Sequence, residues 1–386
     1  MRVCVDIQSA LGPCAGVGRY THQLIRALAR TCSASDELVA FCFDVRRRLE
    51  EHDLPGVQIR ACRWVPGRVV QQAWKRTGWP PFDLLAGSAD VYHFPNFIRP
   101  PLRLGARSVV TIHDLSFLRH PETTEERNLV YLTRHIGPTV ATADAILTDS
   151  HSIAAEIRER WPDATDRVVA VPLALPEGFQ RASIQAVETL RRRYGLHRDY
   201  VLSVGTIEPR KNYSFLVEVF ERLEDLDADL VIAGRLGWKW QPILHRIESS
   251  CRRDRIRHLV LECDADLAAL YTGARLFVWT TLYEGFGFPP LEAMACHVPV
   301  IVSAGGSLPE VCGEGATVVH GYDADQWAQT IRRMWWDESA RADSVRRGRL
   351  NLNRFSWERT ARMTWKVYRA VHARGRPRDV EVEFNS

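Results

Sequence analysis

Two glutamates flank a glycine-rich turn in the C-terminal half of the chain. The segment reads Tyr283-Glu-Gly-Phe-Gly-Phe-Pro-Pro-Leu-Glu292 and follows the apolar run Leu276–Trp279, which is predicted to form a strand. Glycines permit a tight turn with exposed amides, and proline suits the first turn of a helix, predicted here to begin near Pro289. A helix N-terminus after such a turn binds anions and hydroxyl groups, and the carboxylates of Glu284 and Glu292 can accept hydrogen bonds from a polyol. The alternative is a helix cap beside a solvated glutamate.

Two adjacent cations, Arg210 and Lys211, form a second candidate for chemistry. They follow the predicted strand Val201–Val204 and a proline turn. Ligands of open α/β sheets bind beyond the carboxyl ends of the strands, so the pair is placed to neutralise an anionic ligand. The alternative is that Arg210 and Lys211 are an exposed pair on the protein surface, which is the more frequent case for two neighbouring cations. His113 also follows an apolar run, Ser108–Ile112, although a lone histidine is usually structural.

Apolar runs alternate with helical patterns along the chain, which indicates βαβ units and parallel sheets. The predicted strands are Arg2–Ile7, Leu38–Phe43, Val91–His93, Ser108–Ile112, Ala145–Thr148, Val201–Val204, Leu230–Ala233, Leu259–Glu262, Leu276–Trp279 and Val300–Val302. The clearest predicted helices are Tyr20–Ala29, Ser183–Tyr194, Tyr213–Leu223 and Trp357–His372. The pattern loosens at Val171–Gln180, which is predicted to link two domains, because 386 residues exceed what one core usually serves.

The composition is that of an ordinary globular protein, with 46% hydrophobic and 25% charged residues. The formal net charge of +4 is small for a nucleic-acid-binding protein, although it suits an anionic ligand or a membrane surface. The nine cysteines form no C-x-x-C pair, so zinc and redox motifs are unsupported and buried, reduced thiols are expected. Asp6 stands where a signal peptide needs apolar residues, and no apolar run has the length of a transmembrane helix. We therefore expect a cytoplasmic protein.

Three D-x-D strings are candidates for a divalent metal site: Asp227-Ala-Asp229, Asp264-Ala-Asp266 and Asp323-Ala-Asp325. The first precedes a predicted strand. The other two precede helical runs, where aspartate is a frequent N-cap, and we expect caps there. We expect no metal and no other cofactor, with the charge of a diphosphate balanced by Arg210, Lys211 and helix dipoles.

The segment Glu284-Gly-Phe-Gly-Phe-Pro-Pro-Leu-Glu292-Ala-Met-Ala resembles the signature of family-four retaining glycosyltransferases, which have the GT-B fold. Four further segments, in the expected order, extend the resemblance over most of the chain: Gly16-Val-Gly-Arg-Tyr20, His113-Asp-Leu-Ser-Phe, Val204-Gly-Thr-Ile-Glu-Pro-Arg-Lys-Asn212 and Ser307-Leu-Pro-Glu310. Two residues depart from the family's usual pattern. Thr206 stands where many members have arginine, and His297 stands where glycine is usual.

The resemblance implies an α/β protein of two facing Rossmann-like domains, with the donor bound in the cleft between them. We expect an N-terminal acceptor domain at residues 1–178 and a C-terminal nucleotide-sugar-binding domain at residues 179–356. The C-terminal helix, at about residues 357–386, is expected to pack back on the first domain.

The resemblance also implies roles for individual residues. The expected catalytic residues are His113, Arg210, Lys211 and Glu284. The expected donor-binding residues are Gly16, Gly18, Gly205, Thr206, Gly285, Phe286, Gly287, Phe288 and Glu292, and the candidates for acceptor binding are Arg19, Tyr20, Trp74 and Trp79. The two cations would stabilise the leaving diphosphate, the Glu284 turn and its amides would hold the sugar together with His113, and Glu292 would bind the ribose.

Two segments resemble one branch of this family, the bacterial mannosyl- and rhamnosyltransferases of surface-polysaccharide (O-antigen) assembly. They are Gly205-Thr-Ile-Glu-Pro-Arg-Lys-Asn212 and Ala233-Gly-Arg-Leu-Gly-Trp238. This resemblance implies that mannose or 6-deoxymannose moves from a GDP-sugar to a saccharide or lipid-linked acceptor. The anomeric configuration would be retained by front-face displacement. The alternatives are a UDP-sugar donor, a sugar-nucleotide epimerase of the same overall fold and a catalytically silent nucleotide-sugar-binding partner.

The stretch Val69–Leu85 combines aromatic and basic residues: Trp74, Lys75, Arg76, Trp79 and Phe82. Tryptophan beside cations is typical of a membrane-interface edge, so this stretch predicts a peripheral contact at the inner face of the plasma membrane or a site for a lipid-linked acceptor. A partly buried aromatic loop is the alternative. No nucleic-acid partner is expected.

Overall fold

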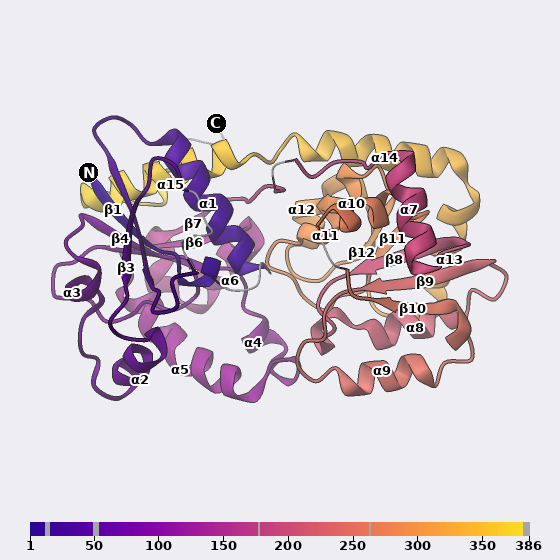
Figure 1. Ribbon diagram of the computed structural model, residues 1–386, viewed down its shortest axis with the longest axis horizontal. Helices are drawn as coiled ribbons and strands as arrows, with labels where there is room; N and C mark the ends of the chain where they lie inside the picture. Colours follow the sequence, from indigo (N-terminus) through magenta and orange to yellow (C-terminus); the bar gives the residue numbers. More distant parts are fainter. Residues whose placement is uncertain (12–15, 49–53, 177, 262–263, 381–386) are drawn as a thin grey trace. The chain divides into compact units, whose positions relative to one another are not determined.

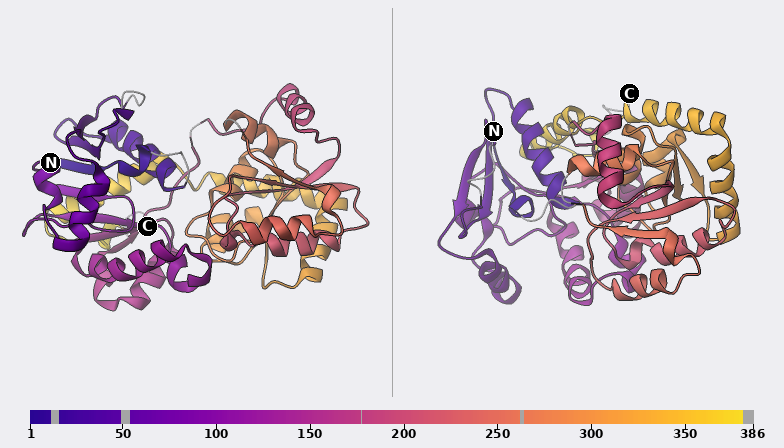
Figure 2. Two further views of the ribbon diagram at one scale, coloured as in Figure 1. Left: turned by 60° about the horizontal axis from the view of Figure 1, so that its bottom comes forward. Right: turned by 45° about the vertical axis from the view of Figure 1, so that its right-hand side comes forward.

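The structure is a computed structural model that describes residues 1–11, 16–48, 54–176, 178–261 and 264–380. Contacts divide the chain into two compact units. Unit 1 comprises Met1–Leu115, Val130–Pro176 and Phe355–Ser386, and unit 2 comprises Ser116–Leu129 and Glu177–Arg354. In each unit a parallel sheet forms the centre and helices cover its faces (Figures 1 and 2).

Unit 1 contains a seven-stranded sheet with the order β3-β2-β1-β4-β5-β6-β7 among its described residues. The strands are β1 (Arg2–Asp6), β2 (Glu37–Phe43), β3 (Gln58–Cys62), β4 (Val91–Phe94), β5 (Ser108–Ile112), β6 (Ala145–Thr148) and β7 (Val168–Ala170). All neighbouring pairs are parallel. The order reverses between β1 and β4, and the loops at the carboxyl ends beside such a reversal form the usual ligand site of this fold.

Unit 2 repeats the design with a six-stranded sheet of order β10-β9-β8-β11-β12-β13, again counted over the described residues. Its strands are β8 (Asp199–Val204), β9 (Ala228–Ala233), β10 (Ile256–Leu259), β11 (Leu276–Trp279), β12 (Val300–Ser303) and β13 (Ala316–Val319). The reversal lies between β8 and β11. The predicted fold class, two Rossmann-like α/β units with parallel sheets, is therefore confirmed.

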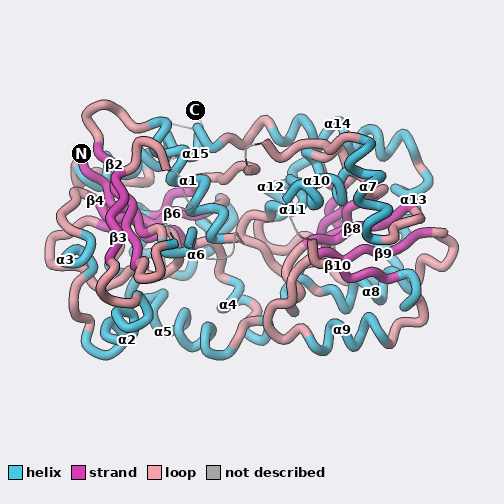
Figure 3. The backbone as a smooth tube through the Cα atoms, in the orientation of Figure 1, coloured by secondary structure: helices cyan, strands magenta, loops and turns pink. Residues whose placement is uncertain are grey.

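Helices surround both sheets, as the cyan and magenta tube of Figure 3 shows. The first half of the chain contributes α1 (Val17–Thr31), α2 (Gly67–Thr77), α3 (Phe82–Ala86), α4 (Ser116–Arg119), α5 (Glu126–Thr142) and α6 (His151–Arg160). The rest of the chain contributes α7 (Ile184–Tyr194), α8 (Tyr213–Glu221), α9 (Gln241–Glu248), α10 (Asp264–Thr272), α11 (Phe288–Ala295), α12 (Leu308–Cys312), α13 (Ala324–Trp336), α14 (Glu338–Leu352) and α15 (Trp357–His372).

The C-terminal helix α15 belongs to unit 1 and packs against α1 (Figure 1). The hydroxyl of Ser356 caps its first turn by accepting from the amide of Arg359. The buried indole of Trp365 donates to the carbonyl of Leu28 at 3.2 Å, and Tyr368 is fully buried. Burial of each such aromatic side chain contributes about 2–3 kcal/mol, so amphipathic packing holds this helix in unit 1.

Three strands were not predicted from the sequence, and one predicted strand was misplaced. The short edge strands β3, β7 and β13 were missed, and the strand predicted at Leu259–Glu262 lies instead at Ile256–Leu259. Three of these four are half-exposed at several positions, so they lack the continuous apolar run by which the central strands were found. β7 is buried but has only three residues.

His297, which departs from the family's usual glycine, lies just after α11 with φ at 60°. This is the left-handed conformation that glycine adopts without strain. The turn therefore keeps its backbone shape with histidine in place. The cost of a left-handed non-glycine residue is about 1–2 kcal/mol.

Two expectations from composition can be compared with the structure. The cysteines in the described part of the chain are free, and five of them, Cys4, Cys42, Cys62, Cys296 and Cys312, are buried. A search of the described residues finds no helix with the length and apolar character that crossing a membrane requires.

Candidate active site

Three charged residues predicted for catalysis meet at the carboxyl ends of the central strands of unit 2. Arg210 and Lys211 end a short 3-10 turn after β8, and Glu284 follows β11. The ammonium of Lys211 lies 2.6 Å from Oε1 of Glu284, and the guanidinium of Arg210 lies 2.9 Å from Oε2. Glu284 and Lys211 are buried, and the Arg210 side chain is 15% exposed. The structure thus brings together three of the four predicted catalytic residues.

The carboxyl group of Glu284 is ionised in this cluster. Burial by itself raises its pKa, but the charges of Arg210 and Lys211 outweigh burial and hold the pKa below the ordinary value of 4.5. The hydroxyl of Thr281 also donates to Oε1 at 2.8 Å. A carboxylate that accepts this many hydrogen bonds is weakly basic, so it suits the positioning of cations and hydroxyls better than nucleophilic attack.

A second carboxylate was not foreseen from the sequence. Glu208 is buried, and its Oε1 lies 2.9 Å from the guanidinium of Arg210. The guanidinium also donates to the carbonyl of Tyr283 at 2.8 Å. Two cations and two carboxylates therefore form a cluster of zero net charge. A lysine ammonium has three donors and a guanidinium has five, so both groups can donate to an incoming anion from the positions in which the carboxylates hold them.

Lys211 is positioned by an aromatic ring as well as by Glu284. Its ammonium lies 4.7 Å from the ring centroid of Trp279, the last residue of β11. The face of an indole attracts a cation, with an energy of up to about 2 kcal/mol when the pair is removed from water. The ring and the carboxylate together fix the lysine in one place, which a group that stabilises a developing charge requires.

The glycine-rich turn that carries Glu284 is held by the loop after β12. The amide of Ser307 donates to the carbonyl of Glu284 at 2.9 Å, and the Ser307 hydroxyl donates to the same oxygen at 3.1 Å. Gly306 approaches so closely that a Cβ atom there would lie 2.3 Å from the Glu284 carbonyl oxygen. The Ser307–Glu310 segment therefore supports the Glu284 turn.

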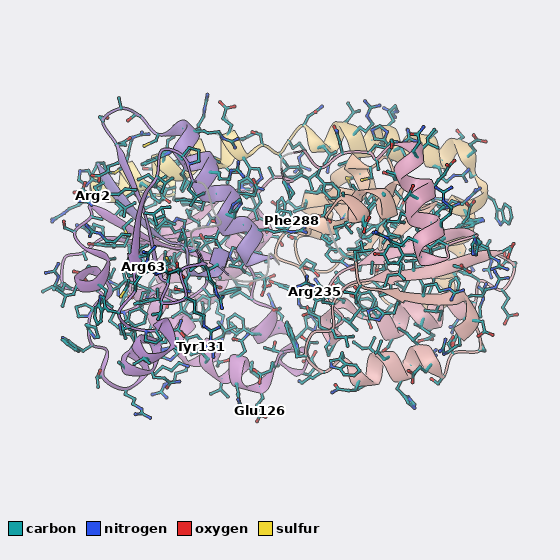
Figure 4. The ribbon with its side chains drawn as sticks, viewed as in Figure 1. Arg2, Arg63, Glu126, Tyr131, Arg235 and Phe288 are labelled. Carbon is teal, nitrogen blue, oxygen red and sulfur yellow. The ribbon has the colours of Figure 1, made fainter. Side chains whose placement is uncertain are left out.

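The remaining donor-binding predictions in this turn lie at the start of α11. Gly285, Phe286 and Gly287 are buried, and Gly287 is the N-cap with φ at 104°, a value suited to glycine. Phe288, labelled in Figure 4, is the first helical residue. The helix thus starts at Phe288, just before the predicted start near Pro289, and the role of the amides of Phe286–Phe288 toward a donor sugar stays a prediction.

Glu292 lies further along α11 and has a different environment from Glu284. It is 2% exposed, and its Oε2 accepts a hydrogen bond from the hydroxyl of Tyr271 at 2.9 Å. Tyr271 belongs to α10 and is itself fully buried. The structure thus places Glu292 beside a tyrosine hydroxyl rather than beside the cations, and its role toward a ribose stays a prediction.

Gly205 and Thr206 lie where the loops after β8 and β9 run side by side. The amide of Gly205 donates to the carbonyl of Ala233 at 2.9 Å, and a Cβ atom on Gly234 would lie 1.9 Å from the Gly205 carbonyl oxygen. Glycine at position 234 is therefore what allows the loops to approach. Thr206 is partly exposed at this strand end.

Arg235 is a further cation at this place that sequence reasoning passed over. Val204 pairs with Ala233 and Ile207 with Leu236, so the same register places Arg235 beside Thr206. Arg235 is exposed and lies in the loop directly after β9 (Figure 4). The signal was available in the sequence, because Arg235 follows a predicted strand just as Arg210 does.

His113 lies directly after β5 in unit 1, as predicted. It is 7% exposed, and both ring nitrogens contact protein atoms. Nδ1 lies 2.8 Å from Oδ2 of Asp149, and Nε2 lies 2.8 Å from the carbonyl oxygen of Pro95. The sequence gave no indication of Asp149 as a partner, although it directly follows the predicted strand Ala145–Thr148.

The first loop of unit 1 is described from Gly16 onward. Gly16 precedes α1, and Gly18 is buried in the first turn of the helix. Arg19 is partly exposed, whereas Tyr20 is 3% exposed and its hydroxyl lies 3.0 Å from that of Thr111. Tyr20 thus links α1 to β5 inside the unit.

Trp74 and Trp79 have opposite environments. The indole of Trp74 donates to the carbonyl of Pro80 at 2.6 Å, and its ring packs near Phe43 and Phe82. Trp79 is 66% exposed. The alternative of a partly buried aromatic loop therefore describes Trp74, and only Trp79 presents its ring to a ligand or surface.

The three D-x-D strings take part in protein contacts. Asp323 caps α13 by accepting from the amides of Asp325 and Gln326, which confirms the cap prediction there. Asp266 pairs with Arg193 at 3.0 Å, and the Asp264 side chain lies outside the described set. Asp227 pairs with Arg198 and Arg255. Within the described residues, no group of three His, Cys, Asp or Glu side chains is arranged to hold a metal ion.

Two Rossmann-like units with a cation–carboxylate cluster at the strand ends are the arrangement expected of a glycosyltransferase of the GT-B fold. Family models agree: residues 15–176 match "Glycosyltransferase Family 4" and residues 187–351 match "Glycosyl transferases group 1". The O-antigen chain mannosyltransferase B of Escherichia coli is 30% identical over 394 residues, which cover 96% of this chain and 100% of that protein. The chain therefore belongs to the glycosyltransferase family that these two models and this mannosyltransferase represent.

Solved structures support the fold at low sequence identity. Sucrose-phosphate synthase from Thermosynechococcus elongatus has a TM-score of 0.75 and 19% identity, with 97% of this chain and 100% of that chain covered. HepE from Anabaena, solved in complex with UDP-glucose, has a TM-score of 0.67 and 17% identity, with 95% and 99% covered.

Proposed function

We propose that this glycosyltransferase moves mannose or 6-deoxymannose from a GDP-sugar to a saccharide or lipid-linked acceptor of bacterial polysaccharide assembly, with retention of configuration and without a metal ion. The observation that carries the proposal is the Arg210–Lys211–Glu284 cluster in a chain that aligns end to end with an O-antigen chain mannosyltransferase. The full coverage of that relative supports the same sugar.

The charge of the donor supports a metal-independent reaction. A nucleoside diphosphate leaving group carries negative charge that grows as the sugar departs. Arg210 and Lys211 lie at the end of β8, and the exposed Arg235 stands beside Thr206 at the end of β9. Together these three cations can take the place that a divalent ion has in other transferases. Arg235 enters the proposal as a third diphosphate contact.

The state of Glu284 supports a front-face reaction. Its carboxylate is held by two cations and a hydroxyl, so it is a poor nucleophile and a poor general acid. We therefore assign the role of base to an oxygen of the leaving phosphate. In the proposed step the acceptor oxygen bonds to the anomeric carbon on the face that the diphosphate leaves, and the acceptor proton passes to the diphosphate.

Nucleotide binding tests the donor. GDP should raise the melting temperature more than UDP or ADP, because a ligand at one hundred times its dissociation constant adds about 2.7 kcal/mol of stability. GDP-mannose should then release GDP when an acceptor is added, and the rate should persist in excess EDTA. A shift with UDP alone would reject the GDP donor, and loss of rate on chelation that magnesium restores would reject metal independence.

The same assay separates the rival activity. An epimerase would convert the nucleotide sugar without releasing nucleotide and without an acceptor. Product analysis of GDP-mannose and UDP-glucose incubated without acceptor distinguishes the two, since a transferase leaves the sugar nucleotide intact apart from slow hydrolysis. Conversion of the sugar with the nucleotide still attached would replace the proposed transfer.

A basic and aromatic segment of unit 1, residues 54–82, supports a lipid-linked acceptor at a membrane. This patch contains no Asp or Glu and carries the exposed cations Arg63, Arg68, Lys75 and Arg76, whereas Arg60 is partly exposed and donates to the carbonyl of Ala86. Trp64 and Trp79 flank α2 and are 76% and 66% exposed. Arg63, labelled in Figure 4, directly precedes Trp64. Each cation near an anionic surface contributes about 1 kcal/mol, so this patch favours peripheral contact.

Liposome sedimentation tests this contact. The double variant Trp64→Ala/Trp79→Ala should pellet less with vesicles containing anionic lipid than the unmodified protein does, because exposed rings insert at the interface. Trp336→Ala is the matched control, since Trp336 is 65% exposed and lies in unit 2. Trp74 is left unchanged, because its ring packs inside unit 1. Equal pelleting of both variants would remove the patch from the proposal.

A further inference from the structure

Both ring nitrogens of His113 contact oxygen atoms, a carbonyl oxygen that only accepts a hydrogen bond and a carboxyl oxygen that only accepts when Asp149 is ionised. Burial raises the pKa of Asp149, and the charge of His113 opposes that rise. Nδ1 lies 2.8 Å from a carboxylate oxygen of Asp149, and Nε2 lies 2.8 Å from the carbonyl oxygen of Pro95. A neutral imidazole has a single N–H, so it can donate to one of these groups but not to both. The two contacts are satisfied together when both nitrogens carry protons, which makes the ring an imidazolium.

We propose that Asp149 is a positioning residue of this transferase, which holds His113 as a doubly protonated imidazolium in one fixed orientation. The proposal rests on the participation of His113 in the transfer reaction. Asp149 itself directly follows β6 and is 4% exposed. It acts through His113 and is not a catalytic residue.

Because His113 and Asp149 are both buried, each side chain can stay charged only while the other compensates its charge. Oδ1 of Asp149 is buried and has no hydrogen-bond partner among the described residues, so the bond from His113 to Oδ2 is what compensates its charge. An isolated buried carboxylate would cost several kcal/mol. Removing either side chain therefore leaves the other charge without compensation.

Among the described residues, the charged or titratable groups found around the His113 ring are Asp149 after β6, Asp114 next in the chain, His93 on β4 and Tyr20 on α1. Burial lowers the pKa of His93 to about 3, so that ring is neutral. Burial also lowers the pKa of His113, but the Asp149 carboxylate outweighs it, and the pKa of His113 lies above 6.5.

The ring orientation is fixed from three neighbouring strands and a helix. Pro95, His113 and Asp149 come from the ends of β4, β5 and β6, which are adjacent in the sheet. The ring of Tyr20 meets His113 edge-on with centroids 4.8 Å apart. The Tyr20 hydroxyl is held in turn by Thr111, whose hydroxyl lies 2.8 Å from Nε2 of His93.

That hydrogen-bonded chain continues to the C-terminal helix. Nδ1 of His93 lies 2.6 Å from the hydroxyl of Tyr368 on α15, and both side chains are fully buried. A buried polar chain in which every member has a partner rigidifies the structure around it. His113 is therefore oriented by Asp149 on one side and by a rigid aromatic neighbour on another.

Nuclear magnetic resonance of the imidazole nitrogens tests the proposal on the unmodified chain. The signal of His113 is assigned by its absence in His113→Gln. At pH 6 both nitrogens of His113 should show the shifts of protonated imidazolium, and the ring should lose its proton at a higher pH than an exposed histidine does. A neutral tautomer at pH 6 would overturn the proposal without the use of any Asp149 variant.

The variant Asp149→Asn supplies the second arm. The His113 titration should move to lower pH, and the alkaline limb of the transfer rate should move with it. Asp144→Asn is the matched control. Asp144 directly precedes β6, whereas Asp149 directly follows it, and Asp144 accepts a hydrogen bond from the Ser108 amide at 2.8 Å. In this control both midpoints should equal those of the unmodified chain.

The outcomes distinguish positioning from a purely structural role. If Asp149→Asn leaves the His113 titration unchanged, Asp149 does not hold the charge. If the titration moves but the rate profile does not, the pair is structural only. If the unmodified chain transfers no sugar from any donor, the proposed function fails, while the nitrogen shifts still report whether Asp149 holds an imidazolium.

Discussion

Glu284→Gln is expected to lower the turnover number at least about 100-fold while the protein stays folded. Loss of one preorganised electrostatic group typically lowers kcat by about 10²–10³. Oε1 of Glu284 accepts from Lys211 and Oε2 pairs with Arg210, so the carboxylate holds both cations. Glutamine keeps the shape of the side chain and one acceptor oxygen. It removes the charge that fixes the two cations.

Glutamine gives a sharper test than alanine. Removing one partner of a buried ion pair typically destabilises a protein by about 3–5 kcal/mol, because the other charge stays buried without compensation. Both variants lose this charge, but Glu284→Ala also leaves a cavity and deprives the Thr281 hydroxyl of its acceptor, so it mixes a larger loss of stability with the loss of catalysis. Turnover and circular dichroism are compared with those of Glu314→Gln, an exposed glutamate of unit 2. Full turnover in a folded Glu284→Gln protein would exclude Glu284 from the catalytic residues.

The difference in unfolding free energy between the unmodified protein and Glu284→Gln should depend on pH. The pKa of Glu284 is lowered in the folded state, so its ion pairs stabilise the fold fully above the ordinary value of 4.5. This contribution is lost as the pH falls through the lowered folded-state pKa. Urea unfolding at several pH values should therefore show the free-energy gap between the two proteins narrowing only below about pH 4.5. An equal narrowing between pH 7 and pH 5 would contradict the direction of the shift.

The central strands could be predicted closely because they are buried on both faces. β5, β6 and β11 have the predicted bounds, and every residue of each strand is buried. Residues in the loop after such a strand lie near the carboxyl edge of the sheet, where ligands bind. That rule placed His113 directly after β5, and Lys211 and Glu284 in the loops after β8 and β11, without any knowledge of their contacts.

The partners of those residues could not be predicted, because pairing depends on the three-dimensional neighbours of each strand. Asp149 meets His113 only because β6 lies beside β5, and Arg235 meets Thr206 only through the register of β8 with β9. A sequence read one strand at a time gives neither neighbour nor register. Glu208 was likewise hidden, since a glutamate in a loop is ordinarily exposed.

The aromatic stretch around α2 shows a different limit. Trp74 and Trp79 are five positions apart, yet one packs near Phe82 and the other is exposed. In α2, Val70 is buried and Ala73 and Trp74 are half-buried on the same face of the helix, at positions i, i+3 and i+4, so this face turns Trp74 toward the unit. Trp79 lies beyond the C-cap Gly78, where the helical period gives no indication of the direction of a side chain.

Lys211→Met is expected to lower kcat by about 10²–10³ and to weaken binding of the free nucleoside diphosphate. The ammonium is buried, 2.6 Å from Glu284 and 4.7 Å from the ring centroid of Trp279. It therefore needs no reorganisation when charge develops on a leaving phosphate. Methionine keeps the apolar stem against the ring, and Arg210 still compensates Glu284, so the fold should survive.

Variants of two arginines serve as comparisons for Lys211→Met. Arg235→Gln should weaken diphosphate binding with a smaller loss of kcat, because Arg235 is an exposed contact at the end of β9 and can move with the ligand. Arg257→Gln, an exposed cation within β10, should change neither quantity. Diphosphate affinity comes from calorimetry and kcat from nucleotide release. If Lys211→Met binds diphosphate as the unmodified protein does, Lys211 does not contact the leaving group. Equal losses in all three variants would instead indicate a general effect of positive charge, with no specific site at the end of β8.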